Sequence, residues 1–194
     1  ATMPGPPEPM PHLRKMHMEE LLQLVRILAE QAELTQASFW EKLTAATKFT
    51  FQASFVSMED SIELTGLYTR IGAWRKEVFQ ATLSKVAKEG AVHWMEPNQL
   101  AELLAIFSRA GSASSDLSGL TTRLFNELEE RILEDGHTFE IDDCVSIVES
   151  MARFATRDNE VILRHLGRER LHPRLLELPG PRIASIGYSY GALG

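Results

Sequence analysis

Residues 187–191, Gly-Tyr-Ser-Tyr-Gly, fit the G-x-S-x-G pattern that presents a nucleophilic serine in α/β hydrolases. That chemistry requires a strand before Ser189, a helix after it, and an Asp and a His later in the chain. Residues 183–186, Ile-Ala-Ser-Ile, would have to form the strand, and no histidine follows Ser189. We therefore keep a hydrolase fragment only as an alternative, and we predict that Tyr188 and Tyr190 dock on a neighbouring protein.

The histidines and the cysteine do not predict a metal site. His12 and His17 are five residues apart and His165 and His172 are seven apart, whereas two ligands on one helix face require a spacing of four. Cys144 is the only cysteine, so the chain cannot form an internal disulfide or a Cys-based zinc site. We predict that Cys144 is an inert core residue, and that the protein holds no metal and no cofactor.

Acidic residues concentrate in the middle of the chain. The whole sequence has a net charge of −7, and residues 96–150 contain 3 basic and 12 acidic residues, a net charge of −9. Glu140, Asp142 and Asp143 lie at a predicted helix start, where the helix dipole favours carboxylates. A second group is either a solvated helix face or a site for a basic partner, and it comprises Glu127, Glu129, Glu130, Glu134 and Asp135.

Basic residues concentrate only toward the C-terminal end, as arginines. Guanidinium groups bind phosphate and carboxylate alike, so the predicted partner is an acidic protein, a lipid headgroup or RNA. Exposed aromatic residues for base stacking are not interleaved with these arginines, and the acidic middle repels nucleic acid, which disfavours RNA. The predicted partner-binding residues are Arg153, Arg157, Arg164, Arg168, Arg170, Arg174, Tyr188 and Tyr190.

Helices must position these side chains, because apolar residues recur at helical spacing along most of the chain. The longest such stripe comprises Leu117, Leu120, Leu124, Leu128 and Ile132. We predict helices over residues 16–32, 36–50, 58–71, 75–89, 97–110, 116–135, 140–155 and 159–170.

The residues between the stripes agree with these helix ends. Glycines typically follow the last turn of a helix, and they occur here at positions 72, 90, 111 and 136. Ser57, followed by Asp60 three residues later, approximates a capping box. Three tryptophans at helix junctions belong either to the core or to an interface, and they are Trp40, Trp74 and Trp94.

The apolar pattern repeats with a period near 40. Leu64, Leu67 and Tyr68 correspond, 39 residues later, to Leu103, Ile106 and Phe107. A period of this length made of two helices predicts an α-solenoid, here of about four helix–turn–helix repeats over residues 16–172. Prolines and glycines predict extended arms on both sides, a Pro-rich arm over residues 1–15 and a Pro/Gly-rich tail over residues 173–194.

Residues 68–72, Tyr-Thr-Arg-Ile-Gly, and residues 107–111, Phe-Ser-Arg-Ala-Gly, each end one helix and precede another. This pattern resembles organellar helical-repeat proteins of the octotricopeptide and FAST-kinase-like families. The resemblance implies a mitochondrial location, with RNA binding or a structural role in an organellar assembly. Members that bind RNA are usually basic, and this chain is acidic, so the structural role is the stronger implication.

Together these features predict an all-α, non-catalytic scaffold rather than an enzyme. We expect an accessory subunit of a large mitochondrial assembly, such as a respiratory complex, the ATP synthase or the mitoribosome, whose partners are other protein subunits. The alternative is an organellar RNA-binding repeat protein, and the alternative location is the cytoplasm. No apolar stretch approaches the roughly 18 residues of a membrane span, so we expect membrane contact at most at the surface.

Overall fold

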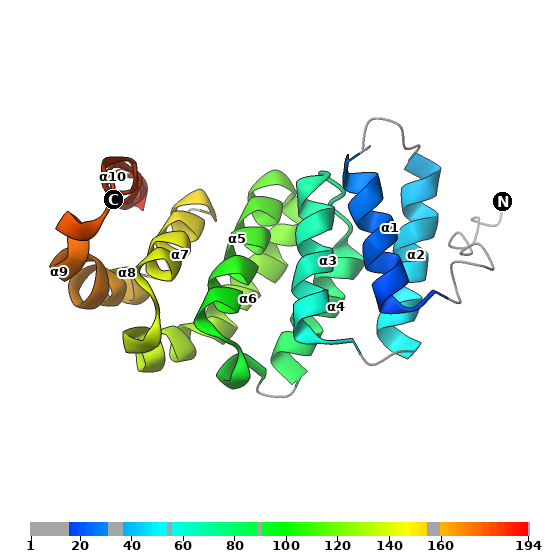
Figure 1. The fold of residues 1–194 in the computed structure, drawn as a ribbon, viewed down its shortest axis with the longest axis horizontal. Coiled ribbons are helices and arrows are strands. Elements are labelled where there is room, and N and C mark those ends of the chain that lie inside the picture. Colours follow the sequence, from blue (N-terminus) through cyan, green and yellow to red (C-terminus); the bar gives the residue numbers. More distant parts are fainter. Residues whose placement is uncertain (1–15, 31–36, 54–55, 89–90, 155–159, 194) are drawn as a thin grey trace. The chain divides into compact units, whose positions relative to one another are not determined.

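The structure is a computed structural model that describes residues 16–30, 37–53, 56–88, 91–154 and 160–193 (Figure 1). Every regular element in these ranges is helical, so the all-α prediction is confirmed. The chain forms two compact units, Ala1–Thr82 and Leu83–Gly194. None of the described helices has both the length and the apolar character needed to cross a bilayer. The predicted arm over residues 1–15 lies outside the described ranges.

The first unit contains α1 (Met18–Glu30), α2 (Ala37–Ala53), α3 (Met58–Arg70) and the start of α4 (Lys76–Lys88). Its core is formed by the apolar stripes, with Leu21 of α1, Leu43 of α2 and Leu64 of α3 all fully buried. Trp40 belongs to this core, where its ring meets Tyr68 edge to face at a centroid distance of 6.1 Å.

Buried hydroxyl groups form hydrogen bonds with one another within the same core. The Tyr68 hydroxyl lies 3.1 Å from Thr47 Oγ1, and Thr47 Oγ1 donates to the Leu43 carbonyl. Since a hydroxyl has one proton to donate, Tyr68 is the donor in the pair. Thr65 and Thr82 make a second buried pair at 2.8 Å. These bonds offset the cost of burying polar groups.

The second unit begins with part of α4 and the 3₁₀ turn η3 (Ala91–Trp94), and three long helices follow. These are α5 (Pro97–Ala113), α6 (Ser115–Asp135) and α7 (Ile141–Phe154), with the turn η4 (Gly136–Thr138) before α7. Helix α7 packs against both α5 and α10 (Gly180–Leu193). Between them lie α8 (Glu160–Leu166), the π-helical turn η6 (Gly167–Leu171), α9 (His172–Arg174) and the 3₁₀ turn η7 (Leu175–Glu177).

Most of the predicted helix ends agree with the structure to within three residues. Helix α3 starts at the predicted N-cap, because Ser57 Oγ accepts a hydrogen bond from the Asp60 amide at 3.0 Å. Gly72 follows α3 with a φ of 69°, a left-handed conformation that favours glycine.

Two predictions about this fold are wrong. Gly111 does not end a helix but lies inside α5, where a Cβ would stand 2.4 Å from Thr121 Oγ1 and 2.8 Å from Phe154 Cε2. It is needed because α6 and the end of α7 pack tightly there. The irregular tail over residues 173–194 is also wrong, because most of it forms helices α9 and α10.

Helix α10 forms despite its Pro and Gly content. Proline is tolerated in the first turn of a helix, where Pro181 lies, because no intrahelical partner exists there for its missing amide. Ile183, Ile186 and Tyr190 recur at spacings of three and four, and Ile186 is buried. Packing on α7 therefore outweighs a cost of about 1 kcal/mol for each interior glycine.

Replacing Gly111 tests the close packing around α5. We expect Gly111→Val to lower the free energy of unfolding by about 2–3 kcal/mol, because its side chain must displace Thr121 or Phe154. Gly119→Val is the matched control, since Gly119 is an exposed helical glycine of α6 whose Cβ would meet nothing within 4 Å. That change should stay within about 0.5 kcal/mol. Urea denaturation measures both, and equal stabilities for the two variants would contradict this packing.

Candidate functional site

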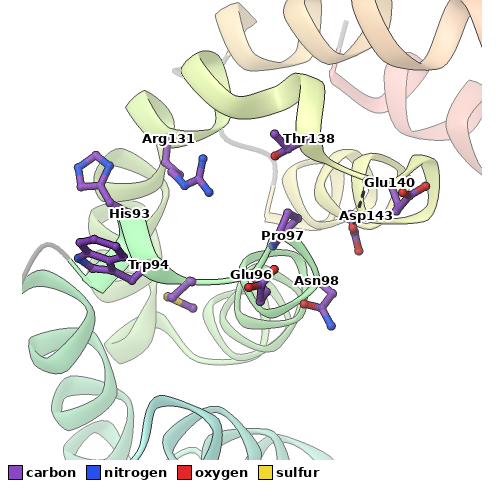
Figure 2. A pocket seen from close by; sticks show the side chains of 10 residues that line it. His93, Trp94, Glu96, Pro97, Asn98, Arg131, Thr138, Glu140 and Asp143 are labelled. Atoms are coloured by element: carbon purple, nitrogen blue, oxygen red, sulfur yellow. Dashed lines mark hydrogen bonds between the residues drawn. The ribbon is translucent and has the colours of Figure 1, made fainter.

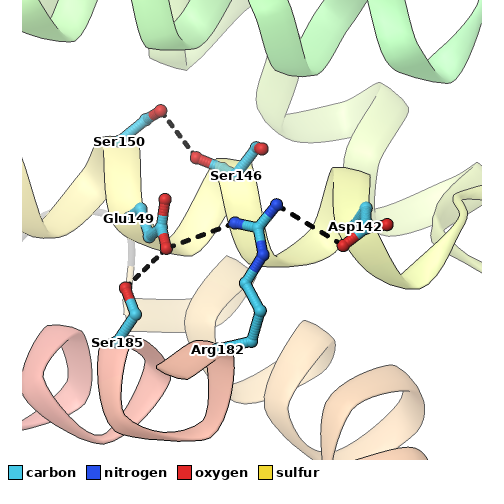
Figure 3. A network of polar contacts seen from close by, with 6 residues as sticks. All are labelled: Asp142, Ser146, Glu149, Ser150, Arg182 and Ser185. Atoms are coloured by element: carbon cyan, nitrogen blue, oxygen red, sulfur yellow. Dashed lines mark hydrogen bonds and ion pairs between the residues drawn. The ribbon is translucent and has the colours of Figure 1, made fainter. Parts of the chain in front are cut away.

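Three polar contacts fix α10 on α7 (Figure 3). The Arg182 guanidinium reaches two carboxylates of α7, with nitrogen–oxygen distances of 3.5 Å to Asp142 and 3.6 Å to Glu149. Ser185 Oγ donates to Glu149 Oε1 at 2.5 Å. Asp142, at the start of α7, therefore has an internal partner that the sequence analysis missed, because Arg182 lay in the segment assigned to an irregular tail.

Tyr190 also attaches α10 to the rest of its unit. Its hydroxyl donates to the Leu163 carbonyl at 2.8 Å, and burial raises the pKa of Tyr190 to about 12. Gly167 lies directly beneath it, because a Cβ there would stand 2.6 Å from the Tyr190 hydroxyl. Partner binding by Tyr190 stays a prediction, and its hydroxyl is already bonded within the chain, whereas Tyr188 is 79% exposed and accessible.

The G-x-S-x-G motif does not form a nucleophile elbow. Residues 183–191 all belong to α10, so neither a strand before Ser189 nor a turn at it is present. Ser189 is only 3% exposed. A hydrolytic serine must reach its substrate, and the strand-to-turn geometry that provides this access is missing here.

Three of the six predicted arginines contact groups of their own chain. Arg164 pairs with Glu160 at 2.5 Å, and Arg174 pairs with Glu177 at 2.9 Å. Arg170 donates from its guanidinium to the Phe139 carbonyl and is partly buried.

The other three arginines have no described partner for their side chains. Arg153 and Arg168 are exposed, and Arg157 lies outside the described residues. Spacing along the helix could not reveal the partners of Arg170 and Arg182, because those contacts join residues that are far apart in sequence. Cys144 is buried as predicted, and burial raises the pKa of its thiol while the neighbouring Arg170 opposes the shift.

A groove of about 770 Å³ opens on the second unit (Figure 2). It is lined by residues from η3, the start of α5, the end of α6, η4 and the start of α7. These residues are His93, Trp94, Met95, Glu96, Pro97, Asn98, Arg131, Thr138, Glu140 and Asp143. We refer to this set as the Trp94 groove.

Local sequence explains why Trp94 lies at the surface of the groove. Val92 and Met95 are buried at 6% and 4% exposure, so they anchor η3 in the unit. His93 and Trp94 fall between these anchors and are turned outward, and Trp94 is 85% exposed. Of the two alternatives left open for this tryptophan, the core is excluded.

The groove is acidic. Glu96, Glu140 and Asp143 contribute carboxylates to its lining. Burial raises the pKa of Asp143, the Glu140 amide opposes this by donating to its carboxylate at 3.3 Å, and the charges of Glu140 and Asp142 raise it further. The carboxylates of Glu140, Asp142 and Asp143 therefore repel one another at the start of α7.

Arg131 is the single cation in the groove lining. Its side chain is only 11% exposed, and it forms an ion pair with Asp135 one helical turn away. Its Nε is buried and has no hydrogen-bond partner among the described residues. Arg131 therefore balances Asp135 rather than the carboxylates of the groove, and it keeps an unused donor.

Elsewhere, the described residues contain no group of three or more histidine, cysteine or acidic side chains suited to a metal ion. No protein-family model matches the chain, and no curated protein matches its sequence. The resemblance to organellar helical-repeat families therefore stays a prediction.

Replacing Tyr190 gives a pH-dependent test of how α10 is held. Because the pKa is raised to about 12 from the ordinary 10.0, the folded chain holds the phenol proton more tightly than the unfolded chain does. This contribution is complete below pH 10 and is lost as the pH rises toward 12. We expect Tyr190→Phe to lower the free energy of unfolding by about 1 kcal/mol at neutral pH.

The difference from the wild type should narrow through the same alkaline range, as measured by denaturant unfolding at several pH values. Tyr188→Phe is the matched control, because Tyr188 lies on the same helix and is 79% exposed, and it should match the wild type throughout. A stability difference for Tyr190→Phe that does not change with pH would show that the buried hydroxyl is not what titrates.

Proposed function

We propose that the chain is a non-catalytic scaffold that binds other proteins as an accessory subunit of a large mitochondrial assembly. Candidate assemblies are a respiratory complex, the ATP synthase and the mitoribosome. The observation that carries the proposal is the Trp94 groove, which combines a large exposed aromatic ring with a concave surface. Exposed tryptophan is unusual on a free surface and is enriched where proteins bind one another.

The repeat organisation is part of the same proposal. Tyr68 in α3 and Phe107 in α5 are 39 residues apart, and each is buried in its own unit. Met151 follows in α7 after a further 44 residues and is also buried. Equivalent buried positions at repeat spacing support a short α-solenoid of about four helix–turn–helix repeats, since such repeats bury the same face each time.

Charge and side-chain contacts favour a protein partner over RNA. RNA binding relies on arginines and lysines that are free to meet phosphates. Arg164, Arg170 and Arg174 contact groups of their own chain, and the groove lining is acidic. A hydrolase receives no support, because Ser189 is buried within α10. The mitochondrial location rests on the repeat resemblance in residues 68–72 and 107–111.

Native mass tests the proposal. We expect the endogenous protein, gently solubilised from isolated mitochondria, to migrate with a large assembly whose size does not change on RNase treatment. Mass spectrometry of the co-migrating proteins then identifies the partners. A free monomer overturns the subunit role, and a particle that collapses with RNase moves RNA binding to the front. If the assembly is recovered from the cytosol and the protein is not found inside protease-treated mitochondria, the mitochondrial location is wrong but the subunit role stands.

A further inference from the structure

We propose that the Trp94 groove binds an arginine- or lysine-bearing segment of a partner protein, with a cationic side chain against the Trp94 indole and the groove carboxylates. The inference deepens the proposed function, on which it rests, by stating the chemistry of the partner. Two features of the groove carry it: an exposed aromatic face and an excess of negative charge in its lining.

The aromatic face is accessible without any rearrangement. Trp94 is 85% exposed while its neighbours Val92 and Met95 are buried, so the ring is held at the surface by a fixed backbone turn. Tryptophan is the best aromatic partner for a cation, and guanidinium groups stack on it more often than ammonium groups do. Figure 2 shows Trp94 beside His93 at one end of the groove, with Glu140 and Asp143 at the other.

The groove lining carries an excess of negative charge, and none of its three carboxylates forms an ion pair among the described residues. Arg174, whose pKa is raised mainly by its pairing with Glu177 and in part by the charge of Glu140, compensates that charge only partly. Of the lining residues, Glu96, Glu140 and Asp143 are acidic, and the one basic residue, Arg131, is paired with Asp135 outside the lining. Burial raises the pKa of Asp143, and the negative charges of Glu140 and Asp142 raise it further, so like charges repel one another at this end of the groove. A cation bound in the groove would relieve this repulsion, whereas phosphate groups would add to it. Charge complementarity thus selects a basic segment and rejects nucleic acid.

Nuclear magnetic resonance of the full chain offers a direct test. The protein has three tryptophans, so it gives three indole N–H signals, and the Trp94 signal is identified by its loss in Trp94→Ala. The probe is a nine-residue peptide of alternating arginine and serine with blocked ends. We expect a saturable shift of the Trp94 signal, with the Trp40 signal unchanged because Trp40 is buried in the first unit. The same peptide with citrulline for arginine keeps the shape without the charge and should produce no shift.

Variants separate the groove from charge in general. We expect Trp94→Ala and the double variant Glu140→Gln, Asp143→Asn each to weaken binding about tenfold, as measured by calorimetry. Asparagine keeps the acceptor at position 143, so the hydrogen bond at the helix start is retained. The matched control is the double variant Glu130→Gln, Glu134→Gln, which also removes two charges, from exposed positions of α6 outside the groove lining, and should change the affinity less than about twofold.

Each remaining outcome decides against the inference. No saturable shift, an equal shift with the citrulline peptide, or an equal loss in the double variant Glu130→Gln, Glu134→Gln would overturn it. A shift produced by a poly-uridine oligonucleotide and not by the arginine peptide would assign the groove to RNA. The assembly found by native mass is measured independently, so peptide binding can fail while the scaffold role stands.

Discussion

In the Leu83–Gly194 unit, helix α7 packs against both α5 and α10, and its apolar face is completely buried. That face consists of Cys144, Val145, Ile147, Val148 and Met151. The polar side chains of the same helix are thereby fixed in position. Asp142 and Glu149 hold Arg182 of α10, while Asp143 lines the Trp94 groove. The burial of α7 therefore fixes both the side chains that hold α10 and a carboxylate that lines the Trp94 groove.

The helices could be predicted because their apolar residues recur every three or four positions, and this signal is local. The same local reasoning failed for α10, where the Pro and Gly composition concealed a helical spacing of Ile183, Ile186 and Tyr190. It failed for Gly111, whose role is a close approach between helices rather than a helix end. Both errors share a physical cause, since packing between distant segments decided the outcome against local propensity.

The candidate site was harder to predict from the sequence than the helices were. The Trp94 groove combines residues 93–98, Arg131, Thr138 and the start of α7, and no spacing rule brings these segments together. The arginines were visible in the sequence, but their contacts with Phe139, Glu160 and Glu177 were not. The sequence did show the excess of acidic residues over 96–150, and for the acidic residues between 127 and 135 it left two alternatives open, a solvated helix face and a site for a basic partner.

Hydrogen–deuterium exchange of the free, full-length chain tests most directly whether α10 and α7 form one packed unit that presents the groove. The account predicts slow exchange for amides of residues 183–193, close to that of α7, because α10 is hydrogen-bonded within itself and held on α7. The two helices should lose protection together as denaturant is added. Exchange of residues 183–193 at the rate of an unfolded chain, with α7 still protected, would contradict it.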